Sequence, residues 1–142
     1  SGLDMQVRYV YLGGKEIDPH SIQQGSTFLA EVWLSFKRTG QSSNTMALSQ
    51  IFPSGWEILS TRYADNGSSS NESPYEYRDI KDDRVNTFFS ISSGEQVHYQ
   101  VKINAAYAGT YNMPPVVVED MYKTAILANS DSFIVEVFAR EE

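Results

Sequence analysis

The sequence predicts an all-β fold, an antiparallel β-sandwich of seven to eight strands in a single domain. Three observations support this fold class. Hydrophobic residues recur with a period of two in several segments, as the side chains of a half-buried strand do. Glycine, proline, serine and asparagine separate these segments. The chain has 142 residues, about the length of one domain, and it shows no linker or internal repeat.

The clearest alternation covers Thr27 to Arg38, where one face is uniformly apolar. A helix would instead place apolar residues three and four positions apart. Similar but shorter patterns recur along the chain, so we expect strands at residues 5–11, 27–38, 45–52, 85–91, 97–103 and 133–137. We also expect a short helical turn near Asp18 to Gln23.

One segment, Ala64 to Glu76, has no period and is rich in serine and asparagine, which is typical of a surface loop. Asn66 and Asn71 each begin an Asn-x-Ser sequon there, which we attribute to chance. Ser1 and Gly2 resemble a remnant of cloning. We therefore expect residues 3–142 to be one β-sandwich domain, excised from a longer protein.

Composition excludes several classes of function. The chain has no cysteine, which excludes disulfides, thiolate-bound metals and a thiol nucleophile. Lys and Arg total 11 against 18 Asp and Glu, a net charge of -7, so we expect no nucleic-acid partner. No apolar run approaches the roughly 20 residues of a membrane helix, so we expect no membrane contact by this domain.

A cluster of charged residues comprises Asp79, Asp82, Asp83 and Arg84. A calcium site takes about six or more oxygen ligands from a defined loop. The spacing here is not that of such a loop, and Lys81 and Arg84 compete for the carboxylates. We interpret the cluster as a structural turn with a local ion pair, and we expect no metal and no cofactor.

The two histidines, His20 and His98, carry no catalytic pattern. His98 occupies the polar phase of a predicted strand and is expected to face solvent, whereas His20 follows Pro19 in a loop. Neither has ligand or triad partners nearby in sequence. The chain also lacks a phosphate-binding glycine loop and a nucleophile elbow, so we expect a protein that is not an enzyme.

Aromatic residues make up 13% of the chain, and most lie on the apolar phase of predicted strands. Trp56 follows a Pro-Ser-Gly turn, and we favour core packing over ligand contact for it. Exposed aromatics would suit an alternative function, a stand-alone sandwich that binds carbohydrate or mediates adhesion through Trp33 or Trp56.

The segment from Met113 to Tyr122 combines two prolines, three valines and an acidic pair. Pro114 and Pro115 are incompatible with a central strand but suit an edge strand or a rigid loop. Two interpretations stay open at this point. Either residues 116–118 form an edge strand, or a rigid loop presents Met121 and Tyr122 as an apolar tip to a partner.

Four short elements carry recognisable motifs: Ile51 to Ile58 with its Pro-Ser-Gly-Trp turn, Arg78 to Arg84 with Asp-Asp-Arg, Tyr107 to Pro115 with Gly-x-Tyr-x-x-Pro, and Glu119-Asp120-Met121-Tyr122. In the same order they resemble the signature of the last domain of bacterial alpha-2-macroglobulins. The match covers roughly Ala47 to Val137, and the first 45 residues carry no matching motif. Phe52 stands where the family more often has leucine.

The resemblance implies a macroglobulin-like sandwich that is the non-enzymatic terminal domain of a broad-spectrum protease inhibitor. Its partners would be other domains of the parent chain, above all a thioester domain that it shields, and target proteases through the parent. The parent would be a lipoprotein or secreted protein of the periplasm or cell envelope. Met121, Tyr122, Pro114 and Pro115 are then expected at the interdomain contact.

A second likeness is rejected. Ser93-Gly94-Glu95-Gln96 is similar to the Cys-Gly-Glu-Gln thioester motif of this family. The family's motif lies in a helical domain, whereas this segment is a predicted turn between two strands, and serine cannot form a thioester.

Overall fold

The structure is a computed structural model that describes residues 3–37, 44–59, 72–122 and 125–140. Within these ranges every regular element is a strand. The strands are β1 (Leu3–Tyr11), β2 (Ser21–Gln23), β3 (Thr27–Phe36), β4 (Asn44–Ile51), β5 (Trp56–Ile58), β6 (Tyr77–Ile80), β7 (Arg84–Ile91), β8 (Gln96–Ala105), β9 (Gly109–Met113), β10 (Val117–Asp120), β11 (Ala125–Asn129) and β12 (Phe133–Phe138).

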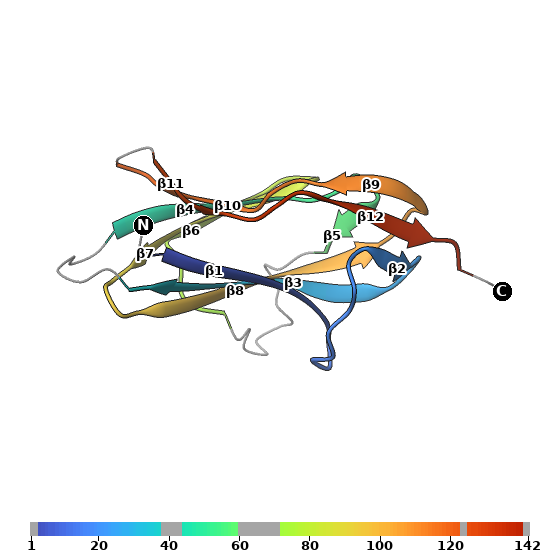
Figure 1. Ribbon diagram of the computed structural model, residues 1–142, viewed down its shortest axis with the longest axis horizontal. Helices are drawn as coiled ribbons and strands as arrows, with labels where there is room; N and C mark the ends of the chain where they lie inside the picture. The colour runs from blue at the N-terminus through green and yellow to red at the C-terminus, as the bar shows by residue number, and fades with distance from the viewer. Residues whose placement is uncertain (1–2, 38–43, 60–71, 123–124, 141–142) are drawn as a thin grey trace.

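The strands form two layers (Figure 1). The first sheet has the order β1-β3-β8-β5, and the second has the order β11-β10-β4-β7-β6. A third sheet, β2-β12-β9, contains strands that continue the second layer beyond β10 and β11. All pairs are antiparallel except β2 with β12, which are parallel. The predicted antiparallel sandwich is therefore confirmed as the fold class.

The period of two determines which side chains fill the space between the layers. The inward residues of β3 are all buried, and they pack against the inward residues of β8, which pairs with β3 in an unbroken register. Burial of these side chains supplies the main stabilisation, roughly 1.5–3 kcal/mol for each large apolar group. The inward residues of β3 are Phe28, Ala30, Val32, Leu34 and Phe36.

The number of strands exceeds the seven to eight that the sequence predicts, because twelve strands occur in the described residues. The additional strands are short and show no clear alternation, so a periodic pattern cannot reveal them. The helical turn expected at Asp18 to Gln23 is wrong. Residues Ser21–Gln23 are a strand, held by residues Glu136–Phe138 more than one hundred positions later.

An aromatic cluster fills one end of the core. Trp56 packs edge-on against Tyr9 and Phe28, with ring centroids 6.0 Å and 5.1 Å away, and stacks on Phe52 at 6.1 Å. Tyr9 also meets Phe133 of β12 edge-on, at 6.4 Å. Tyr9 therefore connects the buried cluster to the flank of the sandwich where β1 is the outermost strand of its sheet.

Among the described residues no helix is long and apolar enough to cross a membrane.

Candidate functional site

The turn after β10 presents the two residues expected at an interdomain contact. Met121 is 45% exposed and Tyr122 is 84% exposed. The turn itself is braced, because the Met121 backbone N–H donates to the Thr45 carbonyl at 3.0 Å. The buried Asp120 accepts a hydrogen bond from the Tyr122 backbone N–H at 2.9 Å and one from the Asn44 amide at 3.2 Å. Met121 and Tyr122 thus form an exposed apolar tip on a turn that backbone and side-chain hydrogen bonds hold in place.

The two prolines lie at the other end of β10. Pro115 is exposed and Pro114 is half-buried, and they connect β9 in the third sheet to β10 in the second. The four residues of β10 separate them from Met121 by roughly 10 Å or more, at about 3.3 Å a residue. The structure therefore does not gather the four expected contact residues into one patch.

The strand β10 resolves the two interpretations of its segment. Residues Val117–Asp120 form a strand, but it is not an edge strand, because it pairs with β4 on one side and β11 on the other. The prolines precede it, where no ladder hydrogen bond is needed. The apolar tip of the loop interpretation is present as well, in the turn that follows the strand.

The charged cluster spans the hairpin of β6 and β7: Asp79 lies in β6, Asp82 and Asp83 in the turn, and Arg84 at the start of β7. Asp83 and Arg84 are paired side by side, with Nε to Oδ1 at 3.0 Å, and the Lys81 ammonium lies 4.0 Å from Asp79. The hydrogen bonds from Arg84 hold the pKa of the Asp83 carboxyl below its usual value. Asp82 is exposed. Nowhere in the described ranges do three or more potential ligand residues gather to hold a metal ion.

The prediction that His98 faces solvent is wrong. His98 is only 8% exposed, and its ring stacks on Trp33 with centroids 3.8 Å apart. Its Nε2 lies 3.7 Å from the Glu31 carboxylate. The cause is a segment beyond the strand's own ladder: the Ser73 N–H donates to the His98 carbonyl, and the Ser73 hydroxyl accepts from the His98 N–H.

The expected surface loop at Ala64 to Glu76 is described only from Glu72 onward, and the asparagines of both sequons, Asn66 and Asn71, lie outside the described residues. The described part is anchored rather than free at its start. Glu72 and Ser73 bond to the edge of β8, where Glu72 accepts from the Gln100 backbone N–H at 2.7 Å. The polar composition of this part therefore serves pairing with β8.

Two of the family-like elements meet in space. The ring of Tyr111 lies directly on the Cα of Gly55, so that a Cβ at position 55 would collide with the ring. Trp56, the next residue, is buried in the core, which confirms the packing role expected for it. This burial also removes Trp56 from any carbohydrate-binding surface.

The segment Ser93-Gly94-Glu95-Gln96 lies at the hairpin between β7 and β8. Gly94 has a φ of 82°, a left-handed conformation that favours glycine. The Glu95 carboxylate accepts a hydrogen bond from the Ser92 backbone N–H at 2.9 Å. Glycine and glutamate thus have local structural roles in this turn.

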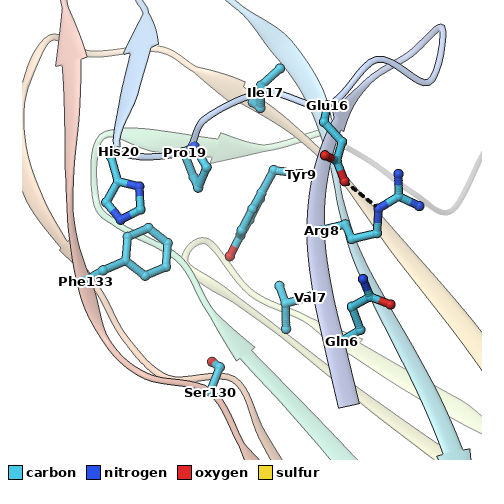
Figure 2. Close-up of a pocket in the computed structure, with 10 residues that line it drawn as sticks. All are labelled: Gln6, Val7, Arg8, Tyr9, Glu16, Ile17, Pro19, His20, Ser130 and Phe133. Atoms are coloured by element: carbon cyan, nitrogen blue, oxygen red, sulfur yellow. Dashed lines mark hydrogen bonds and ion pairs between the residues drawn. The ribbon is translucent and has the colours of Figure 1, made fainter. Parts of the chain in front are cut away.

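A pocket of about 340 Å³ opens at the flank between β1 and β12. Figure 2 shows Tyr9 and Val7 facing Phe133 across it, with His20 beside Phe133. At the rim, the Arg8 guanidinium bonds to Glu16 at 3.0 Å. Sequence reasoning missed this site, because one of its walls comes from a segment more than one hundred positions away from the others. The lining residues are Gln6, Val7, Arg8, Tyr9; Glu16, Ile17, Pro19, His20; and Ser130, Phe133.

Two acid–base features lie at this pocket. Burial raises the pKa of the Tyr9 hydroxyl above its usual 10.0. Asp18 accepts hydrogen bonds from both the backbone N–H and the ring Nδ1 of His20, at 3.0 Å and 2.9 Å, and these bonds hold its pKa low. The pair fixes the orientation of the exposed His20 ring at the pocket mouth.

Comparison with known proteins identifies a family and solved structures that this chain resembles. Residues 2–124 match the family model for the bacterial alpha-2-macroglobulin MG10 domain. An alpha-2-macroglobulin of Xylella fastidiosa is 24% identical over 84% of this chain, and the match covers 8% of that protein. This chain thus spans less than a tenth of the length of that relative.

Solved structures show the same fold. Alpha-2-macroglobulin of Escherichia coli, from domain MG7 to its C-terminus, matches 97% of this chain and 24% of its own with a TM-score of 0.77 at 19% identity. Salmonella alpha-2-macroglobulin reacted with methylamine matches 97% of this chain and 9% of its own, with a TM-score of 0.77 at 20% identity. The match of the family model to most of the chain decides the assignment: the chain belongs to the bacterial alpha-2-macroglobulin family, as a macroglobulin-like domain.

Proposed function

We propose that this chain is a non-enzymatic terminal domain of a broad-spectrum protease inhibitor, and that it packs against a thioester domain and shields it. The observation that carries the proposal is the exposed pair Met121 and Tyr122 on a braced turn. The two side chains are adjacent and apolar, and the hydrogen bonds that brace the turn limit the entropy that would be lost on docking.

The chemistry of a thioester explains why an apolar cover would serve. A thioester carbonyl is attacked by water, hydroxide and small amines, so its lifetime depends on keeping such nucleophiles away. A methionine and a tyrosine pressed over the bond exclude water without supplying a nucleophile of their own at neutral pH. The similar Salmonella protein was reacted with methylamine, a nucleophile small enough to probe such a cover.

The same proposal includes the location of the parent protein and the partners of this domain. The parent is a lipoprotein or secreted protein of the periplasm or cell envelope, and its target proteases are met by the parent rather than by this domain. Other domains of the parent are the direct partners. The small share of related chains that this domain covers supports a role within a larger assembly.

The test uses the intact parent and the rate at which its thioester is lost. Met121→Ala and Tyr122→Ala are each expected to raise spontaneous hydrolysis and methylamine incorporation about tenfold, because each opens a path for water. Tyr107→Ala is the matched control, since Tyr107 is also an exposed tyrosine (56%) but follows β8, away from this turn. Rates equal to wild type in both variants would contradict the shielding role.

A further inference from the structure

The strand β1 has an open edge beside the pocket. It pairs with β3 along its whole length, in an unbroken register from Leu3 to Tyr11. On its other side the Tyr9 carbonyl accepts from the Ile17 N–H, and the Tyr11 N–H donates to the Lys15 carbonyl. Because backbone groups alternate sides along a strand, the N–H and C=O of Val7 point to this same outer side.

Nothing in the described part of the chain pairs with the outer backbone groups of Val7. The pocket begins at the same place, since Val7 and Tyr9 form one wall and Phe133 the opposite wall (Figure 2). No described residue hydrogen-bonds to the Tyr9 hydroxyl either. A backbone donor, a backbone acceptor and an aromatic cavity therefore lie together at one point of the flank.

We propose that this site binds an extended segment from another part of the parent chain, which adds as a further strand along β1. One residue of the segment lies opposite Val7 and exchanges two backbone hydrogen bonds with it. Side chains of residues paired across strands lie on the same face of the sheet. Val7 faces inward, so the side chain of its partner enters the pocket between Val7, Tyr9 and Phe133.

The pocket sets the chemistry of that side chain. Its walls are two aromatic rings and a valine, and its rim carries the Arg8–Glu16 ion pair. The volume of about 340 Å³ accommodates one large apolar side chain, aromatic or branched aliphatic. The residues before and after it point outward, past Gln6 and Arg8, so they are polar. The expected ligand is thus a strand with one bulky apolar residue between polar neighbours.

Two observations favour a segment of the parent over a second copy of this chain. Natural proteins protect an exposed edge strand with proline, lysine, a bulge or a covering element. The stretch from Leu3 to Tyr9 has neither proline nor lysine, and its register is regular; β11 approaches β1 but does not pair with it, so a covering strand is expected. The net charge of -7 opposes self-association, and the match to this chain covers only 8% of a related protein, so most of such a parent lies outside this domain and can supply the segment.

The test titrates this chain, labelled with ¹⁵N, with a blocked peptide Thr-Ser-Thr-Phe-Thr-Ser-Thr. Two matched peptides carry alanine or N-methyl-phenylalanine at the centre. The phenylalanine peptide is expected to slow hydrogen exchange at the Val7 amide and to bind about tenfold more tightly than the alanine peptide, from the apolar area it buries. N-methylation removes the central N–H and is expected to abolish binding.

Two variants on β12 distinguish binding in the pocket from binding elsewhere on the surface. Phe133→Leu shortens the pocket wall and is expected to weaken the phenylalanine peptide several-fold, with folding verified by thermal unfolding. Ile134→Ala, one residue further along β12 and exposed on the opposite face, is expected to leave the affinity unchanged.

Equal affinity for the phenylalanine and alanine peptides, or unchanged exchange at Val7, would overturn the proposal. Exchange that slows with the concentration of the chain alone would assign the edge to a second copy instead. The Met121 turn takes no part in this test, so its outcome is independent of the shielding role.

Discussion

Tyr9 shows how one side chain can serve both the core and the surface. Its ring contacts Phe28 and Trp56 inside the sandwich and Phe133 at the flank. Its side chain is largely buried, and the loss of hydration raises the pKa of its hydroxyl above 10.0. Tyr99 behaves similarly, mainly through burial, although its hydroxyl donates to the Pro74 carbonyl at 2.8 Å. Burial therefore favours the protonated form of both phenols in the folded state.

The stability of the domain should therefore fall in alkaline solution. A folded-state pKa above the unfolded value gives stability that is present below pH 10 and lost as the pH rises beyond it, because only the unfolded chain releases the proton. We expect Tyr9→Phe to reduce the slope of unfolding free energy against pH above 10, measured by urea titration. Tyr122→Phe is the control, since Tyr122 is exposed. An unaltered slope in Tyr9→Phe would show that this phenol is not the group that titrates.

At the scale of elements, the connection between β4 and β5 is determined by a contact with β9. Gly55 lies beneath the ring of Tyr111, whose hydroxyl donates to the carbonyls of Tyr107 and Ala108 at 3.0 Å and 3.2 Å. The Tyr107 N–H in turn donates to the Gly55 carbonyl at 3.1 Å. Two sequence elements that resemble the family's motifs are thus two halves of one contact, which explains glycine and tyrosine at these positions.

Replacing Gly55 by alanine is expected to destabilise the domain by about 1–3 kcal/mol, the usual cost of overpacking. Gly13→Ala is the matched control, because a Cβ there meets nothing within 4 Å. Chemical denaturation measures both. In the Tyr111→Ala background there is no ring to collide with, so adding Gly55→Ala there should lower the free energy of unfolding much less than it does in the wild type. If Gly55→Ala and Gly13→Ala lowered the free energy of unfolding equally, the Tyr111 ring would be shown to move aside without cost.

The sequence predicts long strands well and short ones poorly, for a physical reason. The alternation in β3 reflects burial of one face over ten residues, a local signal. The strand Ser21–Gln23 has three residues and exists because β12 pairs with it, which no local pattern records. His98 follows the polar phase of β8 yet is buried, since Trp33 stacks on its ring and the segment at Ser73 bonds its backbone.

The candidate site was predictable in part. Met121 and Tyr122 follow an acidic pair and two prolines, and their exposure on a turn agrees with the expectation from the sequence. Their contact with a partner stays a prediction. Pro114 and Pro115 are near them in sequence, but the strand β10 lies between the two pairs. The pocket at Val7 and Phe133 was invisible in the sequence, because only the pairing of the layers brings β1 to β12.

At the scale of the molecule, the two flanks of the sandwich differ. One flank is tied by Arg78 of β6, which bonds Glu72 through two nitrogens at 3.2 Å and 2.9 Å. Glu72 also holds the backbone of β8 in the opposite layer, so one buried ion pair connects the two sheets. The Arg78 guanidinium lies over the ring of Tyr75 at 4.3 Å, which adds a cation–π contact. At the other flank β1 approaches β11, and Tyr9 contacts Phe133 beside the pocket.

Breaking this connection should cost far more than breaking a surface pair. Arg78→Met is expected to lower the free energy of unfolding by about 3–5 kcal/mol, because Glu72 would be left buried without its counter-charge. Lys37→Met is the control, since Lys37 and Asp4 are 70% and 67% exposed, and such a pair contributes about 0–1 kcal/mol. Thermal and denaturant unfolding measure both. Similar losses would mean that water reaches the Arg78 pair.

The direction of the strands has a mechanical consequence. β1 starts at one end of the long axis and β12 finishes at the other, and both run along it (Figure 1). Tension applied between these two points pulls β1 lengthwise past β3, and β12 lengthwise past β9. Their ladders are then loaded in shear, so many hydrogen bonds must rupture together instead of unzipping one by one. The domain is therefore expected to resist extension along this axis.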